Sequence, residues 1–427
     1  MNHTVPHPDQ NILQRQPTDR LASIQIWSLI GLILLVPLPL ASNRPIFWLS
    51  CSVLVGFITL LHFILSTKHS APFRIVKDHT ILSILTILFL ISAAVHSQFS
   101  SIVSEASQLG MIRLITYTLF FAMIYQVCNH QKPRDMIIWT VFLAGLLQAL
   151  LAIIALVLLS DAALWGEKIA YKGAATGTFI NRNALAMFLG ISLMAGLAIV
   201  TRYRSDSRML SLTGLEVIAI WFALGLVLIT LITTQSRTGV AVALLGFVFY
   251  IANSTQKSRS FFEPTALMGA VIAVLTLMVF GAGVITRGMF WQADGVDRIQ
   301  LYSQIIQATV ERPLTGYGLD SFRLAFEQFH RPPLTSELVW EYGHSTYLTH
   351  WFEFGVIIGS LPVCLGIALA VGLVRNRQNP LAKAALAALL MCAVHATVDF
   401  ALEMPANVFL LLALLAVGLS DTPKRKA

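Results

Sequence analysis

The chain has 427 residues, of which 56% are hydrophobic and only 12% are charged. Soluble domains are about a quarter charged, so a chain of this length could not cover a soluble surface with so few charges. The same composition excludes a disordered chain, a collagen-like repeat and a coiled coil. The remaining class is an all-α protein that crosses a membrane many times.

The net charge of +8 does not indicate nucleic-acid binding, because lysine and arginine in a membrane protein first report its topology. The four cysteines lie in or beside apolar runs, and no two of them have the spacing of metal ligands. These cysteines are Cys51, Cys128, Cys364 and Cys392. We therefore predict no disulfide framework, no metal site and no cofactor.

Apolar runs near the length of a membrane span recur along the whole chain. A span needs roughly 20 apolar residues, and twelve candidate runs are present. They cover residues 21–41, 46–66, 80–95, 109–128, 136–159, 184–201, 211–233, 240–253, 265–286, 356–374, 381–398 and 405–420. The first run lacks a small-residue cleavage pattern, so it is predicted to be an anchor and not a signal peptide.

Lysine and arginine are distributed unevenly between the two sides of these spans. With residues 1–20 in the cytoplasm, the cytoplasmic segments hold 18 of the 29 lysines and arginines, and the outer side holds ten. Cytoplasmic loops normally carry this excess, so residues 421–427 are also predicted to be cytoplasmic. The predicted organisation is nine spans over 21–286, a partly helical periplasmic loop domain over 287–345 and three spans over 346–420.

Four polar motifs fall on the predicted outer side, where cations are otherwise sparse. They are TGTFINRN (176–183), TQSRTG (234–239), Arg298 with ERPLTGYG (311–318), and YGHSTYL (342–348). Within the long outer segment, IQLYSQIIQATV (299–310) is predicted to be helical. YGHSTYLTHWFEFG (342–355) is predicted to be a helix that runs into the tenth span.

Arginines in these motifs are candidates for binding a phosphate or a diphosphate. Arginine stays charged at any relevant pH and offers five donors in a fixed geometry. Arg237 lies at a membrane boundary among hydroxyl residues, and Arg298 precedes an amphipathic helix, with Arg287 and Arg312 as competitors. Each one alone is compatible with a snorkelling anchor or a solvated charge. Together they predict a cationic outer pocket for the headgroup of an anionic lipid.

His344 is the predicted group for proton transfer, because histidine can accept a hydroxyl proton near neutral pH. Glu341 lies three residues before it and Glu353 nine residues after it, and either carboxylate could orient the imidazole. His330 and His350 are equally available by composition. The pattern alone does not choose among the three histidines.

Four ionisable residues fall inside predicted spans, where such groups are candidates for function. They are Arg113, Glu216, His395 and Asp399. His395 and Asp399 are four residues apart, which predicts that they share one helical face and pair with each other. Arg113 and Glu216 lie nearer to helix ends and are expected to reach the interface.

The outer motifs resemble those of the O-antigen ligase and O-antigen polymerase superfamily of bacterial surface polysaccharide enzymes. The matching stretches are TGTFINRNALA (176–186), TQSRTG (234–239), DRIQLY with ERPLTGYGLDSF (297–322), GHSTYLTHWFEFGVIIG (343–359) and VHATVDFALEMPAN (394–407). The resemblance covers roughly residues 170–410 in order. It implies a GT-C-like fold in the bacterial inner membrane and an inverting, metal-independent glycosyltransferase.

The resemblance also implies roles for single residues. An acceptor hydroxyl would attack a glycan carried on undecaprenyl diphosphate at the periplasmic face and expel the lipid diphosphate. Arg237 and Arg298 would hold the diphosphate, and His344 would activate the acceptor. Many relatives have Asn after this histidine, where this chain has Ser345. We assign further substrate contacts to Arg312, Asn181, Arg182, Asn183, Ser236, Tyr347 and Glu341.

Two acceptors are compatible with the family. A ligase would use lipid A-core, the acceptor of lipopolysaccharide biosynthesis, and a polymerase would use a second lipid-linked glycan; we favour the ligase. A polysaccharide or lipid transporter, or a flippase, is the alternative from another class, because twelve spans would suit it. Transporters usually show paired halves and polar groups at the midplane, whereas these halves are dissimilar and the polar groups gather on the outer side.

Overall fold

The computed structural model describes the chain in seven stretches. They are residues 17–66, 73–164, 166–168, 170–205, 214–253, 288–334 and 339–420. The predicted ninth span, residues 265–286, lies outside the described residues, as do residues 1–16 and 421–427. Within the described stretches every named element is a helix, which confirms the all-α prediction there.

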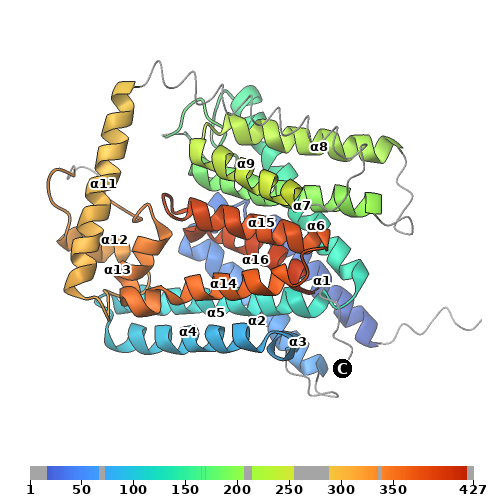
Figure 1. Cartoon of the computed structure of the whole chain (residues 1–427), viewed down its shortest axis with the longest axis horizontal. Coiled ribbons are helices and arrows are strands. Elements are labelled where there is room, and N and C mark those ends of the chain that lie inside the picture. The colour runs from blue at the N-terminus through green and yellow to red at the C-terminus, as the bar shows by residue number, and fades with distance from the viewer. Residues whose placement is uncertain are drawn as a thin grey trace, which may run out of the picture.

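Helices occupy all of the predicted spans that fall within the described stretches, and Figure 1 shows most of them lying side by side. The tenth predicted span, residues 356–374, falls in a bent pair of helices that is described below. The remaining helices are α1 (Pro17–Leu35), α2 (Pro45–Ser66), α4 (Thr80–Phe99), α5 (Ser104–Val127), α6 (Gln131–Ile153), α7 (Arg182–Ser205), α8 (Gly214–Thr233), α9 (Arg237–Ala252), α15 (Pro380–His395) and α16 (Pro405–Ser420).

Six of these helices are long and apolar enough to cross a membrane: α2, α4, α5, α6, α7 and α8. A seventh crossing results if the bent pair α13 (Thr346–Gly359) and α14 (Leu361–Val374) counts as one span. The protein is therefore a polytopic membrane protein, but the described residues hold fewer full-length spans than we predicted. Helices α9, α15 and α16 have 16 residues each, or about 24 Å, which is short of the roughly 30 Å of hydrocarbon in a bilayer.

Of these short helices, α15 and α16 lie in the interior of the bundle, whereas α9 exposes Leu245 and Val248. α15 packs against α7, α9, α14 and α16, and its alanines are almost all buried. Small residues allow helices to approach closely. A Cβ atom on Gly246 of α9 would lie 2.2 Å from the sulfur of Met391 on α15, so this methionine occupies the space above the glycine.

The predicted continuous helix into the tenth span is interrupted, which corrects that prediction. α13 and α14 are bent by 72° relative to each other at Ser360, and Gly355 inside α13 has a φ of 72°, which already breaks the helix there. The turn after α11 packs at this break: Val356 donates its N–H to the carbonyl of Pro313 (2.8 Å), and Gly318 donates to that of Glu353 (2.9 Å). A Cβ atom on Gly355 would lie 2.6 Å from the backbone of Leu314, so only glycine fits both the conformation and the space.

The long segment predicted on the outer side folds against one end of the bundle. It contains α11 (Gly288–Glu311), the short helix α12 (Phe322–Ala325) and the one-turn helix η4 (Phe326–Gln328). Figure 1 shows α11 lying across the end of the bundle instead of along it. We call this end the α11 end. Aromatic side chains from the segment form a core with Phe352 of α13; they are Tyr317, Phe322, Phe326 and Phe329.

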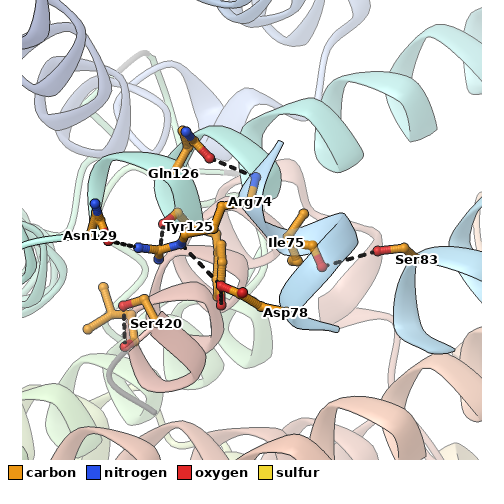
Figure 2. Close-up of polar contacts among 9 residues, drawn as sticks. Arg74, Ile75, Asp78, Ser83, Tyr125, Gln126, Asn129 and Ser420 are labelled. Carbon is orange, nitrogen blue, oxygen red and sulfur yellow. Dashed lines mark hydrogen bonds and ion pairs between the residues drawn. The ribbon is translucent and has the colours of Figure 1, made fainter. Parts of the chain in front are cut away.

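The opposite end of the bundle is fixed by the five-residue helix α3 (Arg74–Asp78), which is joined to the end of α5 by a polar network (Figure 2). The Arg74 guanidinium donates to the carbonyl of Tyr125 (3.0 Å) and to the side chain of Asn129, and it pairs with Asp78. The Tyr125 hydroxyl donates to the Asp78 carboxylate (2.9 Å). Helix α3 is therefore held against the end of α5 by side-chain contacts.

Candidate active site

His344 lies immediately before the first turn of α13. Ser345 is the N-cap residue of this helix, and its hydroxyl accepts a hydrogen bond from the N–H of Leu348 (3.4 Å). His344 has a φ of 50°, in the left-handed region that residues with a Cβ atom seldom adopt. Tyr302 of α11 holds this backbone by donating its hydroxyl to the His344 carbonyl (2.8 Å). The imidazole packs edge-on against Phe400, with ring centroids 4.9 Å apart.

The residues between α15 and the one-turn helix η5 (Ala401–Glu403) form the surface on which α11 and α13 meet; we call them the 396–400 segment. Arg298 of α11 donates from Nη1 to the carbonyl of Val398 (3.0 Å). Thr346 of α13 donates its N–H to the carbonyl of Ala396 (3.0 Å). Arg298 and His344 therefore share one short stretch of chain as their neighbour.

The beginning of α7 reaches the same segment. Asn183 donates its side-chain amide to Asp399 (2.7 Å), a carboxylate that is almost fully buried. Asn181 caps the helix, because its Oδ1 accepts from the backbone N–H groups of Asn183 (2.7 Å) and Ala184 (3.3 Å). Of the predicted substrate contacts in this motif, Asn183 therefore contacts the 396–400 segment directly. Asn181 caps the helix that carries Asn183.

Arg237 is the first residue of α9, directly after its N-cap residue Ser236. The Ser236 hydroxyl is buried and accepts from the N–H of Gly239 (3.2 Å), so this side chain serves the helix end. A Cβ atom on Gly239 would lie 2.4 Å from the Cβ atom of Ala186, which is one turn from Asn183. The first turn of α9 therefore adjoins the first turn of α7, and Arg237 belongs to the α11 end.

Other predicted substrate contacts lie at varied distances from the 396–400 segment. Tyr347 donates its hydroxyl to the carbonyl of Ala393, at the end of α15 (2.9 Å). The guanidinium of Arg182 lies 5.2 Å from the centre of the Tyr171 ring. Glu341 pairs with Arg323 (3.8 Å), and both side chains are exposed.

Arg312 is not brought to the 396–400 segment. It follows the last residue of α11, and its guanidinium lies 5.0 Å from the centre of the Tyr317 ring. Fourteen residues of helix separate it from Arg298, which corresponds to about 20 Å along the axis. Arg298 is therefore the cation of this helix that contacts the segment.

The structure places His395, Asp399 and Arg113, which are three of the four predicted intramembrane residues, in defined surroundings. α15 ends at His395, so Asp399 does not continue the same helical face, and within the described residues no hydrogen bond joins the two side chains. The His395 ring is fully buried, and neither of its nitrogens has a hydrogen-bond partner among the described residues. Arg113 forms an ion pair with Asp320 and thereby ties the turn after α11 to α5.

The three candidate histidines are now distinguishable. His330 stacks on Phe326 inside the aromatic core, and His350 stacks on Phe354 at the break of α13. Glu353, a proposed partner of His344, accepts from the backbone N–H of Phe322 (3.2 Å). Among the described residues, His344 is the histidine whose ring lies against the 396–400 segment.

Tyr302 was missed by sequence reasoning, although a signal was present. It follows Arg298 by four residues in a predicted helix, and this spacing places both side chains on one face. Burial raises the pKa of Tyr302, while the nearby Arg298 lowers it in part. The hydroxyl consequently stays protonated at neutral pH and keeps its role as a donor.

The fold and these contacts define a polytopic membrane protein with cationic, histidine and amide side chains gathered at one end. Residues 222–363 match the protein family described as O-antigen ligase. The chain thus carries an O-antigen ligase family domain, and this domain contains Arg237, Arg298 and His344. A search of curated proteins found no match to the chain.

Proposed function

We propose that this protein is an inverting glycosyltransferase that moves a glycan from undecaprenyl diphosphate to an acceptor hydroxyl at the periplasmic face. The observation that carries the proposal is the convergence of Arg298 and His344 on the 396–400 segment, with Asn183 bound to Asp399 beside them. A cation for the leaving group and a base for the acceptor are the two groups that this transfer requires.

The leaving group is an anionic lipid diphosphate. Arg298 donates one of its five N–H groups to the carbonyl of Val398. This bond orients the guanidinium and leaves other N–H donors for phosphate oxygens. Preorganised donors stabilise developing charge strongly where water is excluded. Arg237, the first residue of α9, is the second cation of this proposal. No metal ion is needed if both arginines neutralise the diphosphate.

The acceptor reacts through its hydroxyl oxygen. This oxygen forms the new glycosidic bond while the bond between the anomeric carbon and the diphosphate oxygen breaks. The hydroxyl proton passes to the imidazole of His344, whose position is fixed by Tyr302 and by the cap of α13. A general base of this kind typically contributes a factor of about 10²–10⁴ to the rate.

Transfer is tested with the purified protein in liposomes, with radiolabelled glycan on the lipid diphosphate and with a chelator present. The variants Arg298→Ala and His344→Ala should each lose at least 99% of the transfer and stay folded. Arg323→Ala, an exposed arginine of the same segment, is the matched control and should retain activity. Full activity in both site variants would refute the proposal, and glycan movement across the membrane without bond formation would indicate a transporter.

For the acceptor we propose lipid A-core, which makes the protein an O-antigen ligase. The test is a deletion strain. A ligase defect leaves long glycan chains on the lipid carrier and none on lipid A-core. Single repeat units left on the carrier would instead identify a polymerase of the same family.

A further inference from the structure

A polar cavity lies on the face of α11 that points away from the 396–400 segment. It has a volume of about 190 Å³. Its wall on the helix side is formed by Gln300, Ser303, Gln304 and Gln307, and the chain around Phe329 and Arg331 closes the other side. These α11 positions recur at three- and four-residue intervals, so they line one face of the helix.

The cavity is built by a specific contact and is not a gap between loops. Gln304 is buried, and its side-chain amide forms two hydrogen bonds with the backbone of Arg331. Nε2 donates to the Arg331 carbonyl (2.8 Å), and Oε1 accepts from the Arg331 N–H (3.1 Å). Phe329 is fixed by Tyr317, with ring centroids 5.0 Å apart. The opposite wall is therefore held at a set distance from α11.

The lining has the chemistry of a site for sugars. Amide side chains donate and accept at once, which matches neighbouring hydroxyl groups on a sugar ring. Gln300 and Ser303 are partly exposed and Gln307 is exposed, so their polar atoms are accessible. The half-buried ring of Phe329 offers an apolar surface for the C–H face of a sugar. A row of glutamines on a solvated helix would lack both this ring and the enclosing wall.

The orientation separates this cavity from the reaction centre. Gln307 follows Arg298 by nine residues, which is about two and a half turns, so the two side chains leave opposite sides of α11. The cavity is also smaller than the roughly 300–1,000 Å³ of pockets that enclose a whole drug-sized ligand. Its size suits one sugar ring of a longer chain.

We infer that the cavity between α11 and residues 329–332 is a distal glycan subsite, which binds a sugar residue some units away from the bond that is formed. The inference rests on the proposed function, because it assigns the subsite to a glycan handled by the same protein. It predicts that long glycans bind more tightly than single repeats. The bound sugar could come from the donor glycan or from the acceptor core.

The test is direct binding to the full-length protein in detergent, measured by calorimetry. The probes are oligosaccharides released by mild acid from the surface polysaccharide of the encoding strain, and, separately, its deacylated core oligosaccharide. The double variant Gln300→Ala with Gln307→Ala should weaken binding of one of the two probes at least tenfold. The probe that is affected identifies whether the subsite binds the donor glycan or the acceptor core. Gln108→Ala is the matched control, because Gln108 contacts Ser104 as Gln307 contacts Ser303, four residues back and at 3.4 and 3.3 Å.

The outcomes separate the two proposals. If neither probe binds, or if the double variant binds as the wild type does, the subsite is refuted and glycan transfer is untouched. If binding is lost in Arg298→Ala but not in the double variant, the reaction centre is the only glycan site and the subsite is again refuted. If the double variant alone loses binding while the wild type transfers no glycan, the subsite stands and the proposed function falls.

Discussion

The hydroxyl of Tyr302 donates a 2.8 Å hydrogen bond to the carbonyl of His344, and this contact joins α11 to the start of α13. Tyr302→Phe should lower kcat about five- to tenfold with little change in KM, because one neutral hydrogen bond contributes roughly 1 kcal/mol. Steady-state transfer assays measure both constants. Tyr250→Phe, which removes a buried hydroxyl bonded to Thr201, is the control and should leave kcat unchanged. An unaltered kcat in Tyr302→Phe would show that this contact does not position the histidine.

The Asn183–Asp399 contact supports a buried carboxylate, and Asn183→Asp should remove it. Two carboxylates would then face each other where an amide donated before. We expect loss of transfer and a lower melting temperature at pH 8, with partial recovery at pH 5 as one carboxylate takes up a proton. A melting temperature that is equal to that of the wild type at both pH values would contradict this assignment.

Breaking the Arg113–Asp320 ion pair should destabilise the protein strongly. Arg113→Ala leaves a mostly buried carboxylate without its cation, and such losses cost about 3–5 kcal/mol. Arg323→Ala breaks the exposed pair with Glu341 and should cost less than about 1 kcal/mol. Thermal unfolding of the two variants in the same detergent compares them. Similar stability losses would show that the Asp320 carboxylate is solvated.

The pH dependence of stability should report on Glu403. Burial raises the pKa of its carboxyl group to about 8 from a reference of 4.5; Arg113 acts in the opposite direction, and Asp320 and Asp399 raise the pKa further. Between these two values the folded protein binds a proton that the unfolded chain has released, so stability falls as the pH rises from about 4.5 to 8. Glu403→Gln should remove this part of the slope. Melting curves from pH 5 to pH 9 test it, and parallel slopes in the two proteins would overturn the assignment.

Sequence reasoning located the helices well, because long apolar runs are local signals. It also selected Arg298, His344 and Asn183, which meet at the 396–400 segment, although their motifs and not any periodicity pointed to them. It did not find the break at Gly355, because this break depends on a turn from residues 313–316 that packs there. The partner of Arg113 was equally hidden, since Asp320 lies 207 residues along the chain and no local pattern connects them.

The contacts of the 396–400 segment limit which parts of the protein can be exchanged between relatives. The stretch matched to the O-antigen ligase family ends at residue 363, whereas Arg298, His344 and Thr346 all contact residues beyond it. Asn183, which binds Asp399, precedes the stretch. The family domain therefore cannot be exchanged by itself between two relatives. A working chimera would have to include the flanking segments with Asn183 and residues 396–400, or contain substitutions that restore their contacts.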